Sequence, residues 1–169
     1  LLTGIFALIE PAVVKSRGRP TGELGIGAEM MIDPSQHEAP LAQTLFYAAG
    51  VLGQELPTVY ANPQDMGGMS LLLADQPSIS MGQVAMSPEV PPQVAAFVAA
   101  RQLAFLRPGL YMRQYVATGT AMKSWLFAAI KLSSPTFPVA ADLEGSVNDA
   151  LNALKQHLPT AERDHLAST

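Results

Sequence analysis

The chain has 169 residues, of which 14 are acidic and 10 basic, giving a net charge of −4. Its length suits one domain with a sizeable core. Its basic residues occur singly apart from Arg17 and Arg19, a pattern that excludes a nucleic-acid-binding patch, and the absence of Cys excludes disulfides, Cys-ligated metals and thiol nucleophiles.

The composition is apolar for a water-exposed domain. Hydrophobic residues make up 49% of the chain and charged residues 14%, well below the usual quarter or so. Such a chain buries much of its surface or shares some of it with a partner. The longest apolar run, residues 1–14, is interrupted by Glu10 and Pro11 and lacks the pattern of a signal peptide, so we expect neither a membrane span nor a leader.

The chain begins without Met and ends abruptly at Thr169, so we expect a fragment of a longer protein. The expected partners are then other domains of that protein, or a separate protein or peptide. The lack of Cys leaves the compartment open, and we expect a cytoplasmic protein. No cofactor is predicted.

The first half of the chain predicts helices followed by short strands. Residues 1–15 predict a helix, with or without a break at Pro11, and residues 16–27 a loop. A second helix is predicted over 40–52, with Leu41, Leu45, Ala48 and Ala49 inward and Gly53 as its end. Alternation and turn residues predict three strands, at 58–60, 70–74 and 78–82.

The segment from Pro91 to Gly109 predicts one uninterrupted helix over 91–106, closed by Arg107-Pro108-Gly109. Its stripe at i, i+4, i+7 and i+11 predicts a buried face packed on the sheet and formed by Val94, Val98, Arg101 and Phe105. Arg101 is the exception on this stripe. Two interpretations stay open: it extends from the helix edge to water, or it fills a former metal position and pairs with a carboxylate.

Helical character continues to the end of the chain. Helices are predicted over 110–117 and 121–132, with Trp125 and Phe127 as large packing residues, and Thr160 is expected to start a short last helix. An amphipathic helix is predicted over 139–158, with an inward set of Leu143, Val147, Ala150, Leu151 and Leu154.

Residues 91–109 resemble the active-site helix of HtpX-like gluzincins, which are zinc metallopeptidases. The resemblance rests on residues 97–100 before the motif and 106–109 after it. The HExxH motif itself is replaced by Arg101-Gln102-Leu103-Ala104-Phe105. In HExxH two His ligands one helical turn apart bind zinc and the Glu activates water. Arg101 and Phe105 cannot ligate a metal and Gln102 cannot act as a base, so the resemblance implies a site without zinc.

The resemblance covers roughly residues 40–110 and implies an α+β fold. The expected domain is mostly helical and zincin-like, with a small three-stranded sheet packed on the motif helix. We expect one domain over 1–169, with an N-terminal helix and loop (1–39), a zincin-like core (40–110) and a helical C-terminal part (111–169). In the family an edge strand holds the substrate peptide, and its counterpart here is Gly67, Gly68, Met69, Ser70 and Leu71.

The family's third zinc ligand is a Glu on a later helix. Glu144, followed by Asn148 and Asp149, matches that pattern only loosely, and the counterpart would otherwise lie beyond Thr169. An alternative metal site consists of His157, Glu162 and His165, which flank a turn at Pro159.

Three functions follow. The first is a catalytically inactive metallopeptidase-like domain that serves as a binding or scaffolding module in a larger protein. The second is an active metal-dependent hydrolase that uses His157, Glu162 and His165 or another unrecognised site. The third is a purely structural domain.

Overall fold

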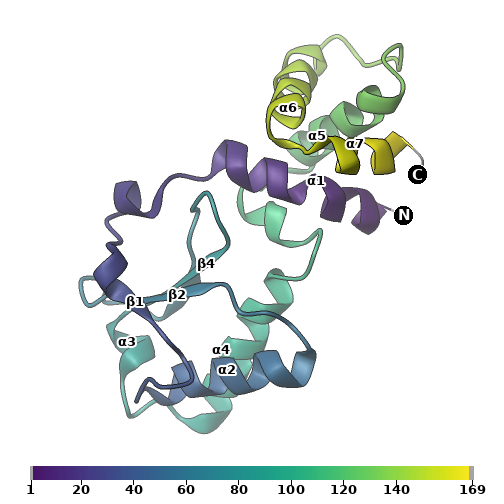
Figure 1. The fold of residues 1–169 in the computed structure, drawn as a ribbon. Coiled ribbons are helices and arrows are strands. Elements are labelled where there is room, and N and C mark those ends of the chain that lie inside the picture. Colours follow the sequence, from purple (N-terminus) through teal and green to yellow (C-terminus); the bar gives the residue numbers. More distant parts are fainter. Residues whose placement is uncertain (1, 168–169) are drawn as a thin grey trace. The chain divides into compact units, whose positions relative to one another are not determined.

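The computed structural model describes residues 2–167 and has the α+β fold that the sequence predicts. That range contains seven α-helices and one four-stranded mixed sheet (Figure 1). Contacts divide the chain into two compact units, one formed by residues 19–107 and the other by residues up to 18 and from 108 onward. No described helix combines the length and hydrophobicity that crossing a bilayer requires. The organisation as one domain over 1–169 stays a prediction.

The sheet of the first unit has the strand order β1-β2-β4-β3. Strands β2 (Thr58–Ala61), β3 (Met69–Leu71) and β4 (Ser78–Met81) correspond to the three predicted strands. Strand β2 pairs with β4 in parallel, and β3 pairs with β4 antiparallel. The prediction of three strands is wrong by one, because β1 (Met31–Ile32) pairs antiparallel with β2. A two-residue strand is too short to produce an alternating pattern.

Three helices accompany this sheet: α2 (Pro40–Leu52), α3 (Gln83–Met86) and α4 (Pro92–Phe105). Helix α2 has the predicted bounds, because Pro40 suits the first helical turn and Gly53 adopts the left-handed conformation, with φ 62°, that ends it. The core combines both long helices with the strands, through buried residues that include Leu41, Leu45, Val59, Ile79, Met81, Ala95, Ala99 and Leu103. The predicted packing of the helix over 91–106 with a small sheet is therefore present, and α2 shares the same core.

The remaining elements of this unit are short. Two 3₁₀ turns, η1 (Thr21–Leu24) and η2 (Ala28–Met30), lie in the predicted loop region and just after it. Arg19 forms an isolated parallel bridge with Ala74. Both turns precede β1 in the chain (Figure 1).

The second unit is helical, with α1 (Leu2–Arg17), η3 (Tyr111–Gln114), α5 (Gly119–Ser133), α6 (Glu144–His157) and α7 (Thr160–Ala167). Helix α1 continues through Pro11 without a break. Helix α6 begins at Glu144, later than the predicted start at residue 139, and the predicted helix over 110–117 is only the 3₁₀ turn η3. Trp125 is buried as expected, in a core with Ile9, Val13, Met112, Val147, Leu154 and Leu158.

Segment 109–112 is fixed to α1 within this unit by two local features. The Glu10 carboxylate accepts a hydrogen bond of 2.9 Å from the main-chain N–H of Met112. Gly109 has φ +80°, and a Cβ atom placed on it would lie 2.6 Å from the main-chain oxygen of Thr3. Burial raises the pKa of Glu10 above its ordinary value of 4.5, against the lowering effect of backbone hydrogen bonds from Met112, Gly109 and Tyr111.

Candidate binding face on helices α2 and α4

Helix α4 has the predicted position but buries a different face. Its buried residues are Ala95, Ala99, Gln102 and Leu103. The predicted stripe is wrong, since Val94 is 48% exposed, Arg101 is exposed, and Val98 and Phe105 are only half-buried. The reason is that α4 is apolar almost all round, so hydrophobicity alone does not select a face. The small side chains of Ala95 and Ala99 allow α4 to pack closely against α2 and the sheet.

Arg101 lies on the surface of α4 and contacts an aromatic ring on its own helix. Its guanidinium carbon lies 5.4 Å from the centroid of the Phe105 ring, the geometry of a cation–π contact. Because the side chain is exposed, its charge needs no buried carboxylate to be tolerated. The structure therefore agrees with the interpretation in which Arg101 extends to water.

Gln102, the residue at the position of the motif Glu, has a structural role. It is only 5% exposed, and its Nε2 donates a hydrogen bond of 2.8 Å to the main-chain oxygen of Met69 in β3. This bond joins α4 to the edge of the sheet and satisfies two buried polar groups at once.

Strand β3 lies at the edge of the sheet, where the resemblance places a substrate-binding strand. The Gly68 carbonyl accepts a hydrogen bond from the Gly82 N–H, and the Leu72 N–H donates to the Ser78 carbonyl. Main-chain groups alternate along a strand, so those of Met69, Leu71 and Leu73 point to the free side. Two carbonyls on that side already accept hydrogen bonds, Met69 from Gln102 and Leu73 from the Arg19 N–H at 3.1 Å.

The main-chain groups of the two glycines that precede β3 also form hydrogen bonds within the chain. The carbonyls of Gly67 and Gly68 accept hydrogen bonds from the N–H groups of Val84 and Gly82, and the Gly67 N–H donates to the Asp65 carboxylate. Together with the two occupied carbonyls of the edge, these bonds leave only the short stretch around Leu71 for a peptide to pair with.

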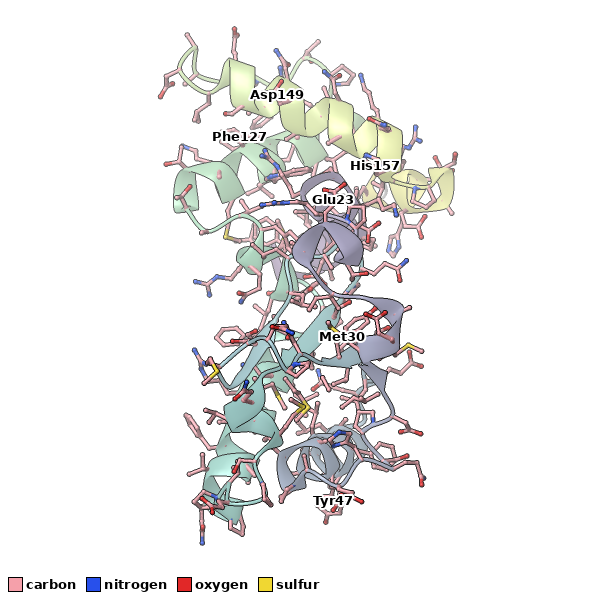
Figure 2. All side chains as sticks on the ribbon, turned by 90° about the vertical axis from the view of Figure 1, so that its left-hand side faces the viewer. Glu23, Met30, Tyr47, Phe127, Asp149 and His157 are labelled. Carbon is pink, nitrogen blue, oxygen red and sulfur yellow. The ribbon has the colours of Figure 1, made fainter. Side chains whose placement is uncertain are left out.

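The alternative metal site is not assembled. His157 ends α6, and Glu162 and His165 lie on α7 (Figure 2 labels His157). Within residues 2–167 no three His, Cys, Asp or Glu side chains lie together as a group that could hold a metal ion, so these three form no ligand cluster. Glu144, Asn148 and Asp149 lie exposed on α6.

A large apolar surface lies on α2. Helix α2 contains no charged residue, and its outward side carries the exposed side chains of Phe46, Tyr47 and Val51. Tyr47, at 72% exposure, extends from the helix into solvent (Figure 2). A helix that is apolar on both its faces is normally covered on both. The outward side of α2 therefore has the character of a buried contact surface.

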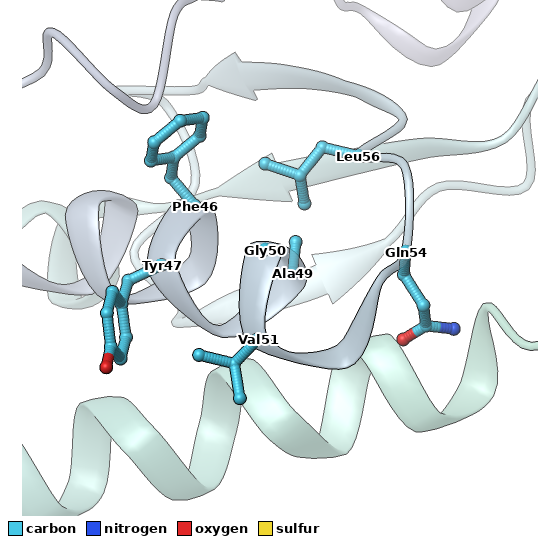
Figure 3. Close-up of a pocket in the computed structure, with 7 residues that line it drawn as sticks. All are labelled: Phe46, Tyr47, Ala49, Gly50, Val51, Gln54 and Leu56. Atoms are coloured by element: carbon cyan, nitrogen blue, oxygen red, sulfur yellow. The ribbon is translucent and has the colours of Figure 1, made fainter.

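This surface contains a hollow of about 460 Å³ whose floor includes Gly50 (Figure 3). Phe46 and Leu56 stand on one side of α2 and Tyr47 and Val51 on the other, with Ala49, Gly50 and Gln54 completing the lining. A Cβ atom added to Gly50 would meet nothing within 4 Å, so the α2 backbone is open to the hollow at this residue. We call this hollow the Gly50 groove.

Two smaller hollows lie beside α4, near its two ends. The first, of about 260 Å³, is lined mainly by apolar residues such as Leu41, Val94 and Val98, with Glu89 as its charged residue. The second, of about 230 Å³, is lined by Leu52, Gln54, Ala100, Ala104 and Arg107. Between them Phe97 stands on the outer side of α4 with 69% of its surface exposed.

Sequence reasoning identified the inward face of α2 and missed its outward one. The available signal was the absence of any charge over residues 40–52 together with a run of apolar residues on the side opposite Leu41 and Leu45. The hollow itself could not be predicted, because it depends on Leu56 and Gln54 folding back beside Gly50.

Comparison of the chain with known protein families, with curated proteins and with solved structures finds no match.

Proposed function

We propose that the chain is a catalytically inactive metallopeptidase-like domain that serves as a binding module, and that the Gly50 groove receives an apolar segment of a protein partner. The observation that carries the binding role is the uncharged outward side of α2, with the three large apolar side chains of Phe46, Tyr47 and Val51 exposed around one hollow. Contiguous exposed apolar surfaces of this kind mark interaction sites.

The metallopeptidase-like part of the proposal is supported by the order of the elements and by α4. Helix α2, strands β2, β3 and β4, and helix α4 follow one another in the order that the resemblance implies, with β1 before them and the short α3 between β4 and α4. At the three motif positions stand a surface cation, a buried amide that holds β3 and a half-buried aromatic ring. None of these groups supplies a metal ligand or a general base.

The groove suits apolar side chains presented by a helix or an extended segment. Its lining offers aromatic and aliphatic surface, with the Gln54 amide as its main polar side chain. A partner residue that enters over Gly50 would approach the α2 backbone closely, because no side chain stands there. Large apolar anchors that fill such pockets usually supply most of the binding energy of an interface.

A random peptide library selected on the purified chain tests the binding role. We expect enriched peptides to carry two or more large apolar residues and to lose at least about tenfold in affinity for the Gly50→Glu variant. Gly50→Ala, which leaves most of the hollow open, is the matched control and should retain binding. Failure to enrich peptides, or peptides that bind wild type and Gly50→Glu equally, would remove the groove from the proposal.

A second assay tests inactivity directly. The chain is incubated with β-casein and Zn²⁺, with and without a chelator, and we expect no cleavage above that of a buffer control. Cleavage that the chelator abolishes would make the chain an active metallopeptidase and overturn this part of the proposal.

A further inference from the structure

The Gly50 groove adjoins a second hollow near the end of α4. That hollow, of about 230 Å³, is lined by Leu52, Gln54, Ala100, Ala104 and Arg107, and we call it the Arg107 hollow. Gln54 lines both hollows, and it stands just after α2, at the end of the Gly50 groove (Figure 3). A partner segment that fills the groove can therefore extend past the end of α2 into the Arg107 hollow.

A single cation stands in this otherwise uncharged surface. In the described part of the chain, Arg107 is the only charged residue that lines either hollow. Its side chain is exposed, and within residues 2–167 it has no hydrogen-bond or ion-pair partner for its guanidinium. A guanidinium presents a planar fork of N–H donors that matches the two oxygens of a carboxylate. Arg107 is therefore available to bind an anion that a partner brings.

The exposed charges close to the Arg107 hollow leave this region with a positive balance. Glu55 is exposed and lines neither hollow, although Gln54 and Leu56 on its two sides both line the Gly50 groove. Arg101 is a second exposed cation, and it follows a lining residue of the Arg107 hollow on α4. Two cations thus stand against one carboxylate, and that carboxylate lies outside the surface on which a partner would rest.

The hollow that contains an acidic residue is separate from the Gly50 groove. It lies near the start of α4, contains Glu89 and shares no lining residue with the groove. A basic residue of the bound segment would therefore face Arg107 without a counter-charge, whereas an acidic residue would be paired. We propose that the apolar segment in the Gly50 groove carries an Asp or Glu residue, whose carboxylate binds the Arg107 guanidinium. This acid preference rests on the proposed function and adds the partner's charge and direction to it.

Arg107 selects and orients the partner rather than supplying most of the affinity. An ion pair at an exposed position changes a binding constant by roughly two- to fivefold. The apolar anchors over Gly50 supply the larger part of the binding energy. Because the chain has a net charge of −4, a partner carboxylate is repelled on average, and its approach is favourable only beside a local cation. Binding of an acidic segment should therefore depend on Arg107.

Peptides selected from a random library on the wild-type chain are the probes for this preference. Among the peptides that lose affinity for Gly50→Glu, we expect an Asp or Glu at a fixed distance from the apolar anchors. Arg107→Gln should weaken such a peptide by roughly two- to fivefold at low salt, and the difference should shrink in about 0.5 M salt. Arg101→Gln is the matched control, because Arg101 is also exposed but lines neither hollow, and its effect should stay below about twofold.

Charge exchange tests the direct pairing. Arg107→Glu should weaken the acidic peptide by at least about fivefold, because two carboxylates then meet. A synthetic form of the same peptide, with Lys in place of its acidic residue, should bind Arg107→Glu to within about twofold of the original pair, since each charge again meets its opposite. Circular dichroism checks that the variants fold.

Three results would overturn the acid preference while leaving the Gly50 groove as a binding site. The first is a set of peptides that depend on Gly50 but share no acidic position. The second is equal weakening by Arg107→Gln and Arg101→Gln, and the third is a Lys peptide that fails to recover affinity for Arg107→Glu. A library without any Gly50-dependent peptide is a different outcome, because it would overturn the proposed function and the acid preference together.

Discussion

The side-chain amide of Gln102 donates a 2.8 Å hydrogen bond to the main-chain oxygen of Met69, which lies 33 positions earlier in the chain. Gln102 stands at the central position of the degenerate motif on α4, and Met69 belongs to β3, the strand at which the resemblance would place a substrate. In a zinc peptidase the side chain at this position faces a metal-bound water. Here it stabilises the fold by completing the hydrogen bonding of a sheet edge.

Replacing Gln102 should therefore cost stability. In Gln102→Leu the buried oxygen of Met69 loses its donor, and we expect a loss of about 1–3 kcal/mol in the free energy of unfolding. The matched control is Gln93→Leu, on an exposed position of the same helix, which should change stability by less than about 0.5 kcal/mol. Urea denaturation of both variants measures the difference, and equal effects would contradict the role given to this bond.

Restoring the zinc motif tests the resemblance. In the triple variant Arg101→His, Gln102→Glu and Phe105→His the two imidazoles lie one helical turn apart on α4. We expect Zn²⁺ binding, weak if the third ligand is missing, by isothermal titration. Most of the stability loss should come from Gln102→Glu, since an ionised carboxylate cannot donate to Met69, whereas Phe105 is only half-buried.

Any pair of histidines at this spacing on a helix attracts zinc to some degree, so the triple variant needs a control. Gln93→His with Phe97→His places such a pair on exposed positions of the same helix. If positions 101 and 105 face an emptied metal pocket, the triple variant should bind Zn²⁺ at least about tenfold more tightly than this control. Equal affinities would mean that the resemblance is accidental.

The buried carboxyl of Glu10 should make stability depend on pH. Its pKa is raised by burial, so its contribution to stability is full below its ordinary value of 4.5 and falls as the pH rises through the higher folded value. The unfolding free energy of wild type minus that of Glu10→Gln should therefore be larger near pH 4 than near pH 7. Urea denaturation at the two pH values tests this, and a difference that grows with pH would contradict it.

The conformation of Gly109 predicts a large effect of a small substitution. Its φ is +80°, and the Thr3 main-chain oxygen lies 2.6 Å from the point that a Cβ atom would occupy, so Gly109→Ala combines backbone strain with a steric clash. We expect a loss of about 1–3 kcal/mol. Gly145→Ala is the control, since a Cβ there meets nothing within 4 Å, and it should be neutral or stabilising by at most about 1 kcal/mol. Thermal denaturation distinguishes them, and similar melting temperatures would count against the geometry described for Gly109.

Local signals in the sequence predicted most of the elements. Helix α2 has the predicted bounds because Pro40 favours a helix start and Gly53, in the left-handed conformation, ends the helix. The three strands were predicted because turn residues separate them. Strand β1 was missed because two residues carry no periodicity. The start of α6 was misplaced because residues 139–143 are apolar except for Asp142 and yet are not helical.

The faces of the helices were harder to predict than their positions. On α4 the predicted stripe with Val94 and the observed one with Ala95 are both mainly apolar, with Arg101 on the first and Gln102 on the second, and only packing against α2 and the sheet distinguishes them. The same ambiguity hid the binding face, because an exposed Phe46 or Phe97 has the sequence pattern of a core residue. Hydrophobic pattern identifies a helix reliably, but it does not say which of two apolar sides faces a partner.

The central claim is that the outward side of α2 binds a protein partner, and site-specific photo-crosslinking tests it most directly. A benzophenone amino acid is placed at Tyr47 and, as a control, at Asp149, which is exposed on α6 (Figure 2). In cells that express the protein, we expect a discrete crosslinked partner from position 47, lost when Gly50→Glu is added, and none from position 149. Equal crosslinking from both positions, or crosslinking at 47 that Gly50→Glu leaves unchanged, would contradict it.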